Sequence, residues 1–214
     1  MLFMKFWEKN EKKIIILGAG GALLDIIEIL ELNNLNKFEV YDDNKKSSNK
    51  LKIFGNIKSA IKKYKNKDNC FFIFAFGTAK TTKLRKILFL RYKLKPKKLI
   101  TLIHPNASIS RYAKIGRGSI IKSNATILPG AIIGYNVIVS QLCSVSHNVK
   151  IGSHSILAPS SSCSGGSKIG NSCFLGTNCT INENISIGQN SVVGLGSKVI
   201  KSMKSNNIYY DKKK

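Results

Sequence analysis

A six-residue period runs without interruption through the second half of the chain. Stepping by six from Ile109 to Val199 meets an apolar side chain at sixteen consecutive positions. The next residue is Gly in seven of these sixteen cases, and the residue four places on is usually small, with Ile185 as a bulky exception. Chance does not plausibly produce this pattern in a chain in which 43% of the residues are apolar.

An even period keeps one face of a strand pointing inward, whereas a heptad or a 3.6-residue helix does not repeat every six residues. We predict that each hexapeptide is a short strand plus a corner, with the branched residue in a narrow core and Gly relieving the corner backbone. Three hexapeptides make one coil, so residue n stacks near n+18. The prediction is a left-handed parallel β-helix over residues 104–202, with a little over five coils, followed by a short basic tail at 203–214.

Four of the five cysteines fit this pattern as structural thiols. Cys143, Cys173 and Cys179 fall in the small column, and Cys163 falls in the branched column. The count is odd and no CxxC pair occurs, which argues against a disulfide framework or a zinc site and favours a reducing, cytoplasmic compartment. No apolar run reaches the roughly 18–20 residues of a membrane span.

The first half reads as alternating strands and helices. Residues 14–17 predict a buried parallel strand, followed by a tight turn at Gly18, Gly20 and Gly21 and a helix over 22–32. A second strand over 38–41 ends at an acidic pair, and a third over 71–76 ends at Gly77. A helix over 82–92 and a short strand over 99–103 complete the expected order. This succession is typical of a Rossmann-like nucleotide site, since glycines admit phosphates and an acid after the second strand accepts hydrogen bonds from ribose or base. We therefore predict an α/β domain over residues 1–103, in front of the all-β solenoid.

The charge of the chain allows two interpretations. The 35 Lys and Arg against 11 Asp and Glu give a formal net charge of +24. This excess either attracts a polyanion or is a Lys-rich solvated surface. We favour the second interpretation and expect no nucleic-acid partner, because no basic stripe is interleaved with aromatic residues.

The chemistry is expected at one of only three histidines, and their spacing does not suggest a metal site. His147 falls at an outward-facing wall position of the repeat, and Gly165 stands one coil later, followed by a second Gly. A general base beside free backbone N–H groups suits acyl transfer, which needs proton removal from the acceptor and donors for an oxyanion. His154 is also predicted to face outward, on the surface or along a cofactor.

The motifs together resemble a known family. They are residues 14–21 (IIILGAGG), 40–43 (VYDD), 74–77 (FAFG), 102–105 (LIHP) and 146–152 (SHNVKIG). The chain is similar over about residues 12–200 to the sialic acid O-acetyltransferase and nucleotide-sugar N-acetyltransferase family. Its best-known members acetylate nucleotide-linked 4-amino-4,6-dideoxy sugars, as in bacillosamine synthesis. The resemblance implies acetyl-CoA as co-substrate, no metal, and a homotrimer with active sites between subunits.

The resemblance also implies roles for individual residues. His147 matches the catalytic base, Gly165 the residue whose N–H faces the thioester oxygen, and Asn148 stands where many members have an acid. On the coenzyme track it places Ile156, where members have a His, and also Thr177, Gly194 and Gly196. The nucleotide-sugar side is implied at Asp42 and Asp43, at Gly18, Gly20, Gly21 and Gly77, and at Arg85 as the match for a family Arg. The C-terminal Gly-x-Pro-Ala-Lys closure of the family is missing.

Three hypotheses about function follow from these residues. The first is N-acetylation of a nucleotide-linked amino sugar for a surface glycan such as lipopolysaccharide. The second is O-acetylation of a sialic acid or polysaccharide hydroxyl, with the same fold and base. The third is a scaffold or binding protein that has lost turnover, which Asn148, Ile156 and the altered C-terminus suggest.

Overall fold

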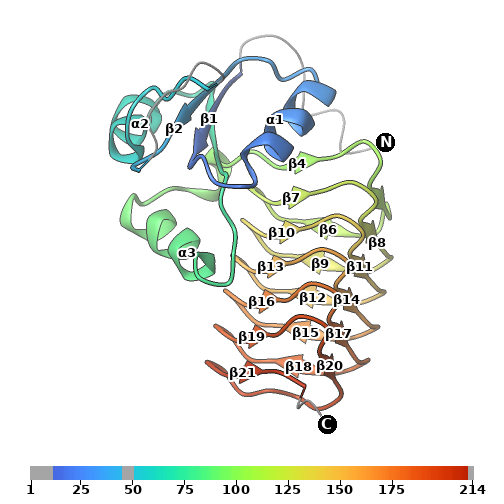
Figure 1. Cartoon of the computed structure of the whole chain (residues 1–214). Helices are drawn as coiled ribbons and strands as arrows, with labels where there is room; N and C mark the ends of the chain where they lie inside the picture. The colour runs from blue at the N-terminus through green and yellow to red at the C-terminus, as the bar shows by residue number, and fades with distance from the viewer. Residues whose placement is uncertain (1–11, 45–50, 212–214) are drawn as a thin grey trace.

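The computed structural model describes residues 12–44 and 51–211, and Figure 1 shows a small α/β part resting on a long β-helix. The α/β part holds a parallel sheet of order β2-β1-β3. Strand β1 is central, and residues 14–17 are completely buried, as an unbroken apolar strand in a parallel sheet should be. The elements are β1 (Lys13–Leu17), α1 (Leu23–Leu32), β2 (Phe38–Tyr41), α2 (Ile57–Tyr64), β3 (Cys70–Phe74), α3 (Thr82–Arg91) and the 3-10 helix η2 (Pro96–Lys98). The predicted Rossmann-like order is confirmed.

Helix α2 was not predicted from the sequence. Its signals are an N-cap and apolar residues at helical spacing. The Asn56 side chain accepts a hydrogen bond from the Ser59 N–H at 2.8 Å. Ile57, Ala60, Ile61 and Tyr64 form the buried face of the helix. The high Lys content of this segment concealed that face.

The second half of the chain is a left-handed parallel β-helix of three sheets. Each strand has two residues, and all but the last pair with the strand 18 residues away, as the period predicts; Ile138, for example, pairs with Ile156 and Ile156 with Phe174. In the last strand, Ile208 pairs with Val192, 16 residues earlier. The first sheet contains β4 (Leu102–Ile103), β7 (Ile120–Ile121), β10 (Ile138–Val139), β13 (Ile156–Leu157), β16 (Phe174–Leu175), β19 (Val192–Val193) and β21 (Ile208–Tyr209). The second contains β5 (Ser108–Ile109), β8 (Thr126–Ile127), β11 (Ser144–Val145), β14 (Ser162–Cys163), β17 (Thr180–Ile181) and β20 (Lys198–Val199). The third contains β6 (Lys114–Ile115), β9 (Ile132–Ile133), β12 (Lys150–Ile151), β15 (Lys168–Ile169) and β18 (Ser186–Ile187).

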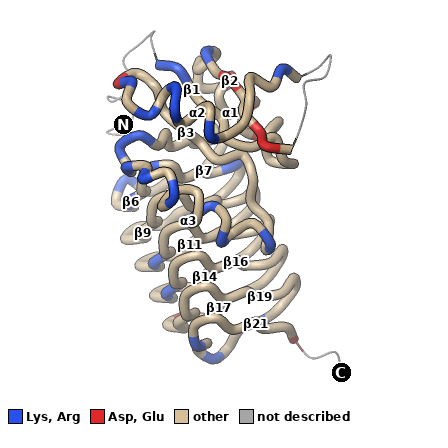
Figure 2. The backbone as a smooth tube through the Cα atoms, turned by 90° about the vertical axis from the view of Figure 1, so that its left-hand side faces the viewer, with Lys and Arg blue, Asp and Glu red and all other residues tan. Residues whose placement is uncertain are grey.

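The outward residue of each strand gives every sheet its own surface. On the first sheet this residue is apolar, and the N-terminal part packs on it, so we call it the covered face. On the second sheet it is a Ser or Thr in every strand before Lys198, which makes the hydroxyl face. On the third it is Lys in three of five strands, which makes the lysine face. Figure 2 shows Lys and Arg far outnumbering acidic residues, and Glu183 is the one acid in the sequence between residues 102 and 210.

The corners explain the glycines differently from our prediction. Every sixth residue from Gly118 to Gly196 has a positive φ, three places after the apolar position. Six of these fourteen residues are Asn, which tolerates this conformation better than most side chains. The Gly column directly after the apolar position serves a different purpose. A Cβ on Gly116 would lie 2.5 Å from the carbonyl carbon of Gly134, so these glycines permit close stacking of coils.

The ends of the β-helix also lie outside the predicted bounds. The first strand begins at Leu102, because Leu102 and Ile103 pair with β7. The segment after residue 202 is a further partial coil, since Met203 pairs with Ile187 and β21 pairs with β19. The predicted basic tail is therefore wrong for residues 203–211, which close the open end of the core. Residues 212–214 lie outside the described part.

The two parts share a hydrophobic interface. Ile120, Ile138 and Ile156 on the covered face are each at most 3% exposed and belong to one cluster with residues of α1 and β3. Full burial of a side chain of this size contributes about 1.5–3 kcal/mol. At the rim, Lys122 Nζ lies 2.5 Å from Asp25 Oδ2 of α1. These contacts fix the N-terminal part over the upper coils (Figure 1).

Candidate active site

Each coil has three corners, which position the candidate side chains. We call them the first, second and third corner, following the covered, hydroxyl and lysine faces respectively. His147 and Gly165 lie in the second corner of adjacent coils, between β11 and β12 and between β14 and β15. The His147 side chain is exposed.

The stacking of His147 on Gly165 is confirmed by close contact. A Cβ on Gly165 would lie 2.5 Å from His147 Cε1 and 2.6 Å from Nε2, so the imidazole occupies the space that any larger residue would need. The adjacent Gly166 N–H donates to the His147 carbonyl at 3.0 Å. Within the described residues the Gly165 N–H donates no hydrogen bond. The corner therefore presents an imidazole and an available backbone donor side by side.

Asn148 lies beside His147, as the sequence places it. Its Nδ2 is 3.4 Å from His147 Nδ1, which is long for a hydrogen bond. Its backbone has φ 59°, and its Oδ1 lies 2.2 Å from where a Cβ on Gly130 would stand, one coil earlier. Asn148 therefore contacts the base only weakly and belongs mainly to a column of left-handed residues.

The predicted coenzyme residues are only partly brought together. Thr177 and Gly196 are stacked and exposed at the first corner, and the Gly196 N–H donates to the Thr177 carbonyl at 2.8 Å. Gly194 lies beneath the Tyr210 ring, whose Cδ1 would be 2.0 Å from a Cβ there. Ile156 is 2% exposed at the domain interface. Contact of Gly194 or Ile156 with the coenzyme is therefore contradicted, because protein already covers both.

The glycine turn and the acidic pair form a connected site in the N-terminal part. Asp42 Oδ2 accepts a hydrogen bond from the Ala19 N–H at 2.6 Å, which joins the end of β2 to the turn. Gly18 has φ 99° and leaves room for the Phe76 ring. Asp43 is exposed, and its Oδ1 accepts from the Ile57 N–H at 2.8 Å. This cluster has the arrangement that the sequence predicts for a nucleotide site.

The remaining glycines of this region differ in their surroundings. Gly21 is exposed, with open space where a Cβ would lie, whereas Gly20 packs against the Ala75 carbonyl oxygen, 3.3 Å from where a Cβ would lie. Gly77 contacts the covered face, because a Cβ there would lie 2.6 Å from Ile138 Cδ1. Gly77 thus lets the end of β3 approach the β-helix.

Arg85 does not reach a substrate in this structure, which contradicts its predicted role. It is 0% exposed, and its guanidinium donates to the carbonyls of Phe74 and Phe76 and to the side chain and carbonyl of Asn136. Burial lowers the pKa of Arg85 to about 9. Arg85 joins α3 to the third corner of the β-helix.

His154 is buried in the same contact between α3 and the third corner, so its predicted place on the surface or along a cofactor is wrong. It is 3% exposed, contacts the rings of Phe89 and Tyr135, and its Nδ1 lies 2.9 Å from Asn136 Nδ2. Burial and the nearby Arg85 lower its pKa to about 4, so the ring is neutral at physiological pH. His154 faces outward from the β-helix but is covered by α3.

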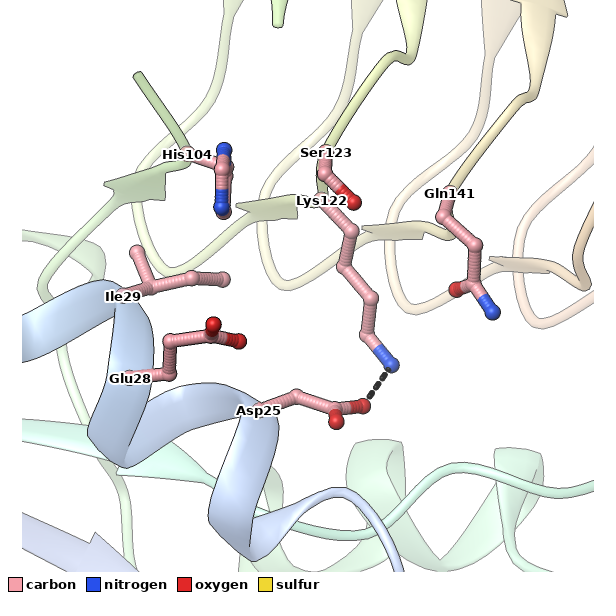
Figure 3. A pocket seen from close by; sticks show the side chains of 7 residues that line it. All are labelled: Asp25, Glu28, Ile29, His104, Lys122, Ser123 and Gln141. Carbon is pink, nitrogen blue, oxygen red and sulfur yellow. Dashed lines mark hydrogen bonds and ion pairs between the residues drawn. The ribbon is translucent and has the colours of Figure 1, made fainter. Parts of the chain in front are cut away.

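A pocket opens between α1 and the first corner of the upper coils (Figure 3). It was not predicted from the sequence. It measures about 190 Å³ and brings together residues far apart in the sequence: Asp25, Glu28, Ile29, His104, Lys122, Ser123 and Gln141. The 18-residue stacking of Ser123 and Gln141 was available as a signal, but the approach of α1 was not.

The candidate site residues lie in two separate places within one chain. His147 and Gly165 lie at the second corner, whereas the nucleotide-type turn sits over the covered face. No group of three His, Cys, Asp or Glu in the described ranges is placed to hold a metal ion. In residues 12–44 and 51–211 no helix is long and apolar enough to cross a bilayer.

Comparison with known proteins gives two family matches. Residues 99–209 match the GMPPB C-terminal domain, and residues 13–89 match the PglD N-terminal domain. No curated protein sequence matches the chain.

Solved structures share the whole architecture. The acetyltransferase domain of PglB from Neisseria gonorrhoeae has a TM-score of 0.82 at 23% identity, covering 90% of this chain and 93% of that one. A variant of perosamine N-acetyltransferase from Caulobacter crescentus, in complex with CoA and GDP-perosamine, has a TM-score of 0.82 at 22% identity, covering 92% of each chain. WeeI from Acinetobacter baumannii has a TM-score of 0.65 at 17% identity, covering 92% of this chain and 95% of that one. At these identities the similarity establishes the fold.

Proposed function

This chain belongs to the GMPPB C-terminal domain family and, with its PglD-type N-terminal domain, to the bacillosamine-type hexapeptide-repeat acyltransferases, and we propose that it transfers the acetyl group of acetyl-CoA to a nucleotide-linked amino sugar. The observation that carries the proposal is the exposed His147 imidazole stacked on Gly165, whose N–H has no partner among the described residues. The solved structures with CoA and GDP-perosamine support the two substrates by analogy.

The reaction that this corner can perform follows from its groups. His147 accepts a proton from the acceptor amine as the nitrogen attacks the thioester carbon. The Gly165 N–H donates to the oxyanion of the tetrahedral intermediate. Collapse of the intermediate expels the CoA thiolate, which takes the proton from His147 and leaves an amide. We propose a 4-amino-4,6-dideoxy sugar as acceptor and surface-glycan synthesis as the context.

The distance between the proposed base and the proposed coenzyme residues within one chain supports a homotrimer with active sites between subunits. His147 and the Thr177–Gly196 pair flank the hydroxyl face at its two edges. Before Lys198 this face carries small uncharged residues in a chain of net charge +24, so copies can approach there with little repulsion. A threefold arrangement with this face toward the axis brings the second corner of one copy to the first corner of the next. Each site then joins His147 and Gly165 of one copy with Thr177 and Gly196 of its neighbour.

The cellular location is part of the same proposal. All five cysteines are free and buried, and the substrates are intracellular metabolites. We place the protein in the cytoplasm, where thiols stay reduced.

The test is release of CoA thiol from acetyl-CoA with a panel of UDP- and GDP-linked 4-amino sugars. We expect turnover with one member, a base-stable amide product, and a loss of about 10²–10⁴-fold in His147→Ala. Turnover only with a sugar hydroxyl, giving a base-labile ester, supports the O-acetyltransferase alternative. Coenzyme binding without turnover on any acceptor supports the scaffold alternative and refutes the enzyme.

A further inference from the structure

Helix α3 carries apolar side chains on two opposite sides. Leu88 and Phe89 are buried in a cluster with residues of β1 and β3. Leu84, Ile87 and Leu90 lie on the other side of the helix and are 39%, 47% and 58% exposed. A helix that is apolar all round is normally buried on every side. The described part of the chain covers only one side of α3, so its second apolar side is available to a partner.

Basic side chains alternate with these apolar ones around the exposed side of α3. Lys83 and Arg91 each stand four residues from Ile87, so all three are neighbours on the helix surface. Both are exposed, as is Lys80 in the turn before the helix. The sequence has no Asp or Glu over residues 69–182, so no carboxylate of α3 or of the coils beneath it neutralises these charges. Figure 2, which views the molecule from the side that carries α3 in Figure 1, shows Lys and Arg along this helix.

We name this surface the outer face of α3, and it comprises Lys80, Lys83, Leu84, Ile87, Leu90 and Arg91. Helix α3 docks on the third corner, where the Phe89 ring contacts His154. This corner joins the lysine face to the covered face, so it lies opposite the hydroxyl face. In the proposed trimer the hydroxyl face turns toward the axis. The outer face of α3 therefore points away from the axis and is not covered by a neighbouring copy.

A partner must match both the charge and the apolar surface of this face. A second copy is disfavoured, because two such faces would place Lys and Arg against Lys and Arg. A nucleic acid supplies phosphates for the charge but no apolar layer for Leu84, Ile87 and Leu90. An anionic bilayer supplies both, since its head groups attract Lys and Arg and its acyl boundary accepts Leu and Ile. The stems of the lysines can lie along that boundary while their amines reach the head groups.

We propose that the outer face of α3 binds the protein to the surface of an anionic phospholipid membrane. Helix α3 then lies parallel to the bilayer. Leu84, Ile87 and Leu90 enter the acyl boundary, and Lys83 and Arg91 lie among the phosphates. Three side chains bury little apolar area, so the contact is reversible and weakens as salt screens the charges. This inference goes beyond the proposed function and does not depend on it.

Co-sedimentation of the full chain with lipid vesicles measures this contact. The probes are vesicles of phosphatidylcholine alone and of phosphatidylcholine mixed equally with phosphatidylglycerol. We expect the wild type to bind the anionic vesicles and to bind the neutral ones about tenfold more weakly. Leu84→Gln/Ile87→Gln should weaken binding to the anionic vesicles about tenfold, because it removes apolar area and keeps the charge. Lys80→Gln/Lys83→Gln should weaken it by a similar factor, because it removes two charges and keeps the apolar area.

Each double variant has a matched control on the β-helix. Ile132→Gln/Ile200→Gln removes two branched side chains that are 41% and 66% exposed. Lys150→Gln/Lys168→Gln removes two exposed lysines of the lysine face and lowers the net charge as much as the α3 variant does. Both controls should keep the wild-type affinity to within about twofold. All substitutions fall on exposed residues, so we expect equal melting temperatures, which show that every variant is folded.

The outcomes decide what occupies the face. Wild-type protein that does not bind anionic vesicles, or that binds neutral ones equally well, overturns the proposal. Equal losses in the α3 variants and their controls assign the binding to net charge and also overturn it. Sedimentation velocity without lipid tests a second copy, because an assembly larger than a trimer that Leu84→Gln/Ile87→Gln breaks up assigns the face to self-association instead. CoA release without vesicles should be equal in the wild type and the α3 variants, so the membrane contact and the acetyltransferase fail independently.

Discussion

His147 and His154 lie seven residues apart in the same coil, yet their surroundings are opposite. His147 is exposed at the second corner, against a glycine whose N–H donates to no residue that the structure describes. His154 is 3% exposed at the third corner, beneath α3 and next to Arg85. The repeat gives both side chains an outward position. The docking of the N-terminal part decides that one is available for chemistry and the other is a structural joint.

The largest effect is expected when the contact between Arg85 of α3 and Asn136 of the third corner is removed. Replacing Arg85 by Met leaves the carbonyls of Phe74 and Phe76 and the Asn136 side chain without their buried donor. We expect a loss of about 3–5 kcal/mol in the free energy of unfolding, measured with urea. The control is Lys83→Met on the exposed side of α3, which should change it by less than about 0.5 kcal/mol. Equal stability of the two variants would show that the joint contributes nothing.

The next effect concerns the exposed histidine. Gly165→Ala places a Cβ within 2.6 Å of the His147 ring and forces the ring to move. We expect turnover to fall about 100-fold with little change in melting temperature, because the core is untouched. Ser164→Ala, in the same corner, is the control and should retain turnover. A Gly165→Ala enzyme of normal activity would contradict the assignment of this corner.

A smaller effect distinguishes the histidines by pH. The pKa of His154 is lowered from 6.5 to about 4 by burial and by Arg85, so the unfolded chain binds a proton that the folded chain does not. Stability from this group is complete above pH 6.5 and is lost as the pH falls toward 4. We expect the melting temperature to fall between pH 6.5 and 4.5, and this slope to flatten in His154→Gln. A His154→Gln profile parallel to that of the wild type refutes the linkage.

The smallest effect is a gain. Asn148→Asp places a carboxylate beside His147 Nδ1, now 3.4 Å from the Asn148 amide nitrogen. A carboxylate orients the ring and stabilises its charged form better than an amide. We expect kcat to rise by up to about tenfold, while Asn184→Asp, at the same corner two coils further along the β-helix, leaves it unchanged. A slower Asn148→Asp enzyme would show that the amide itself is needed.

Much of the fold follows from the sequence because it is set by local repetition. The apolar column from Ile109 to Val199 fixes which side faces the core, and the 18-residue register predicts that His147 meets Gly165. The strands β1 and β2 follow from short apolar runs that end at turn residues. These features depend on neighbours one coil or one turn away.

The errors arise where distant segments meet. Arg85 reaches Asn136, 51 residues along the chain, and this contact exists only after α3 docks on the β-helix. The burial of His154 and Ile156 depends on the same docking. Tyr210 covers Gly194 because the last segment adds a strand that no hexapeptide signal marks. The pocket at Glu28 likewise forms between elements whose approach no periodicity encodes.

The two-residue strands and the left-handed residue at every sixth position give the β-helix a fixed rise per coil. Each coil advances the chain by about 4.8 Å, the spacing of neighbouring strands. A one-residue insertion turns every later side chain to the wrong side of the wall, whereas an insertion of 18 residues restores the frame. Between Ile109 and Val199 an insertion therefore keeps the register only if it adds whole coils. A coil added beyond Gly196 would lengthen the protein and leave the distance between His147 and the N-terminal part unchanged. A coil added between Ile121 and His147 would move the histidine away from the N-terminal part by one coil, or about 4.8 Å.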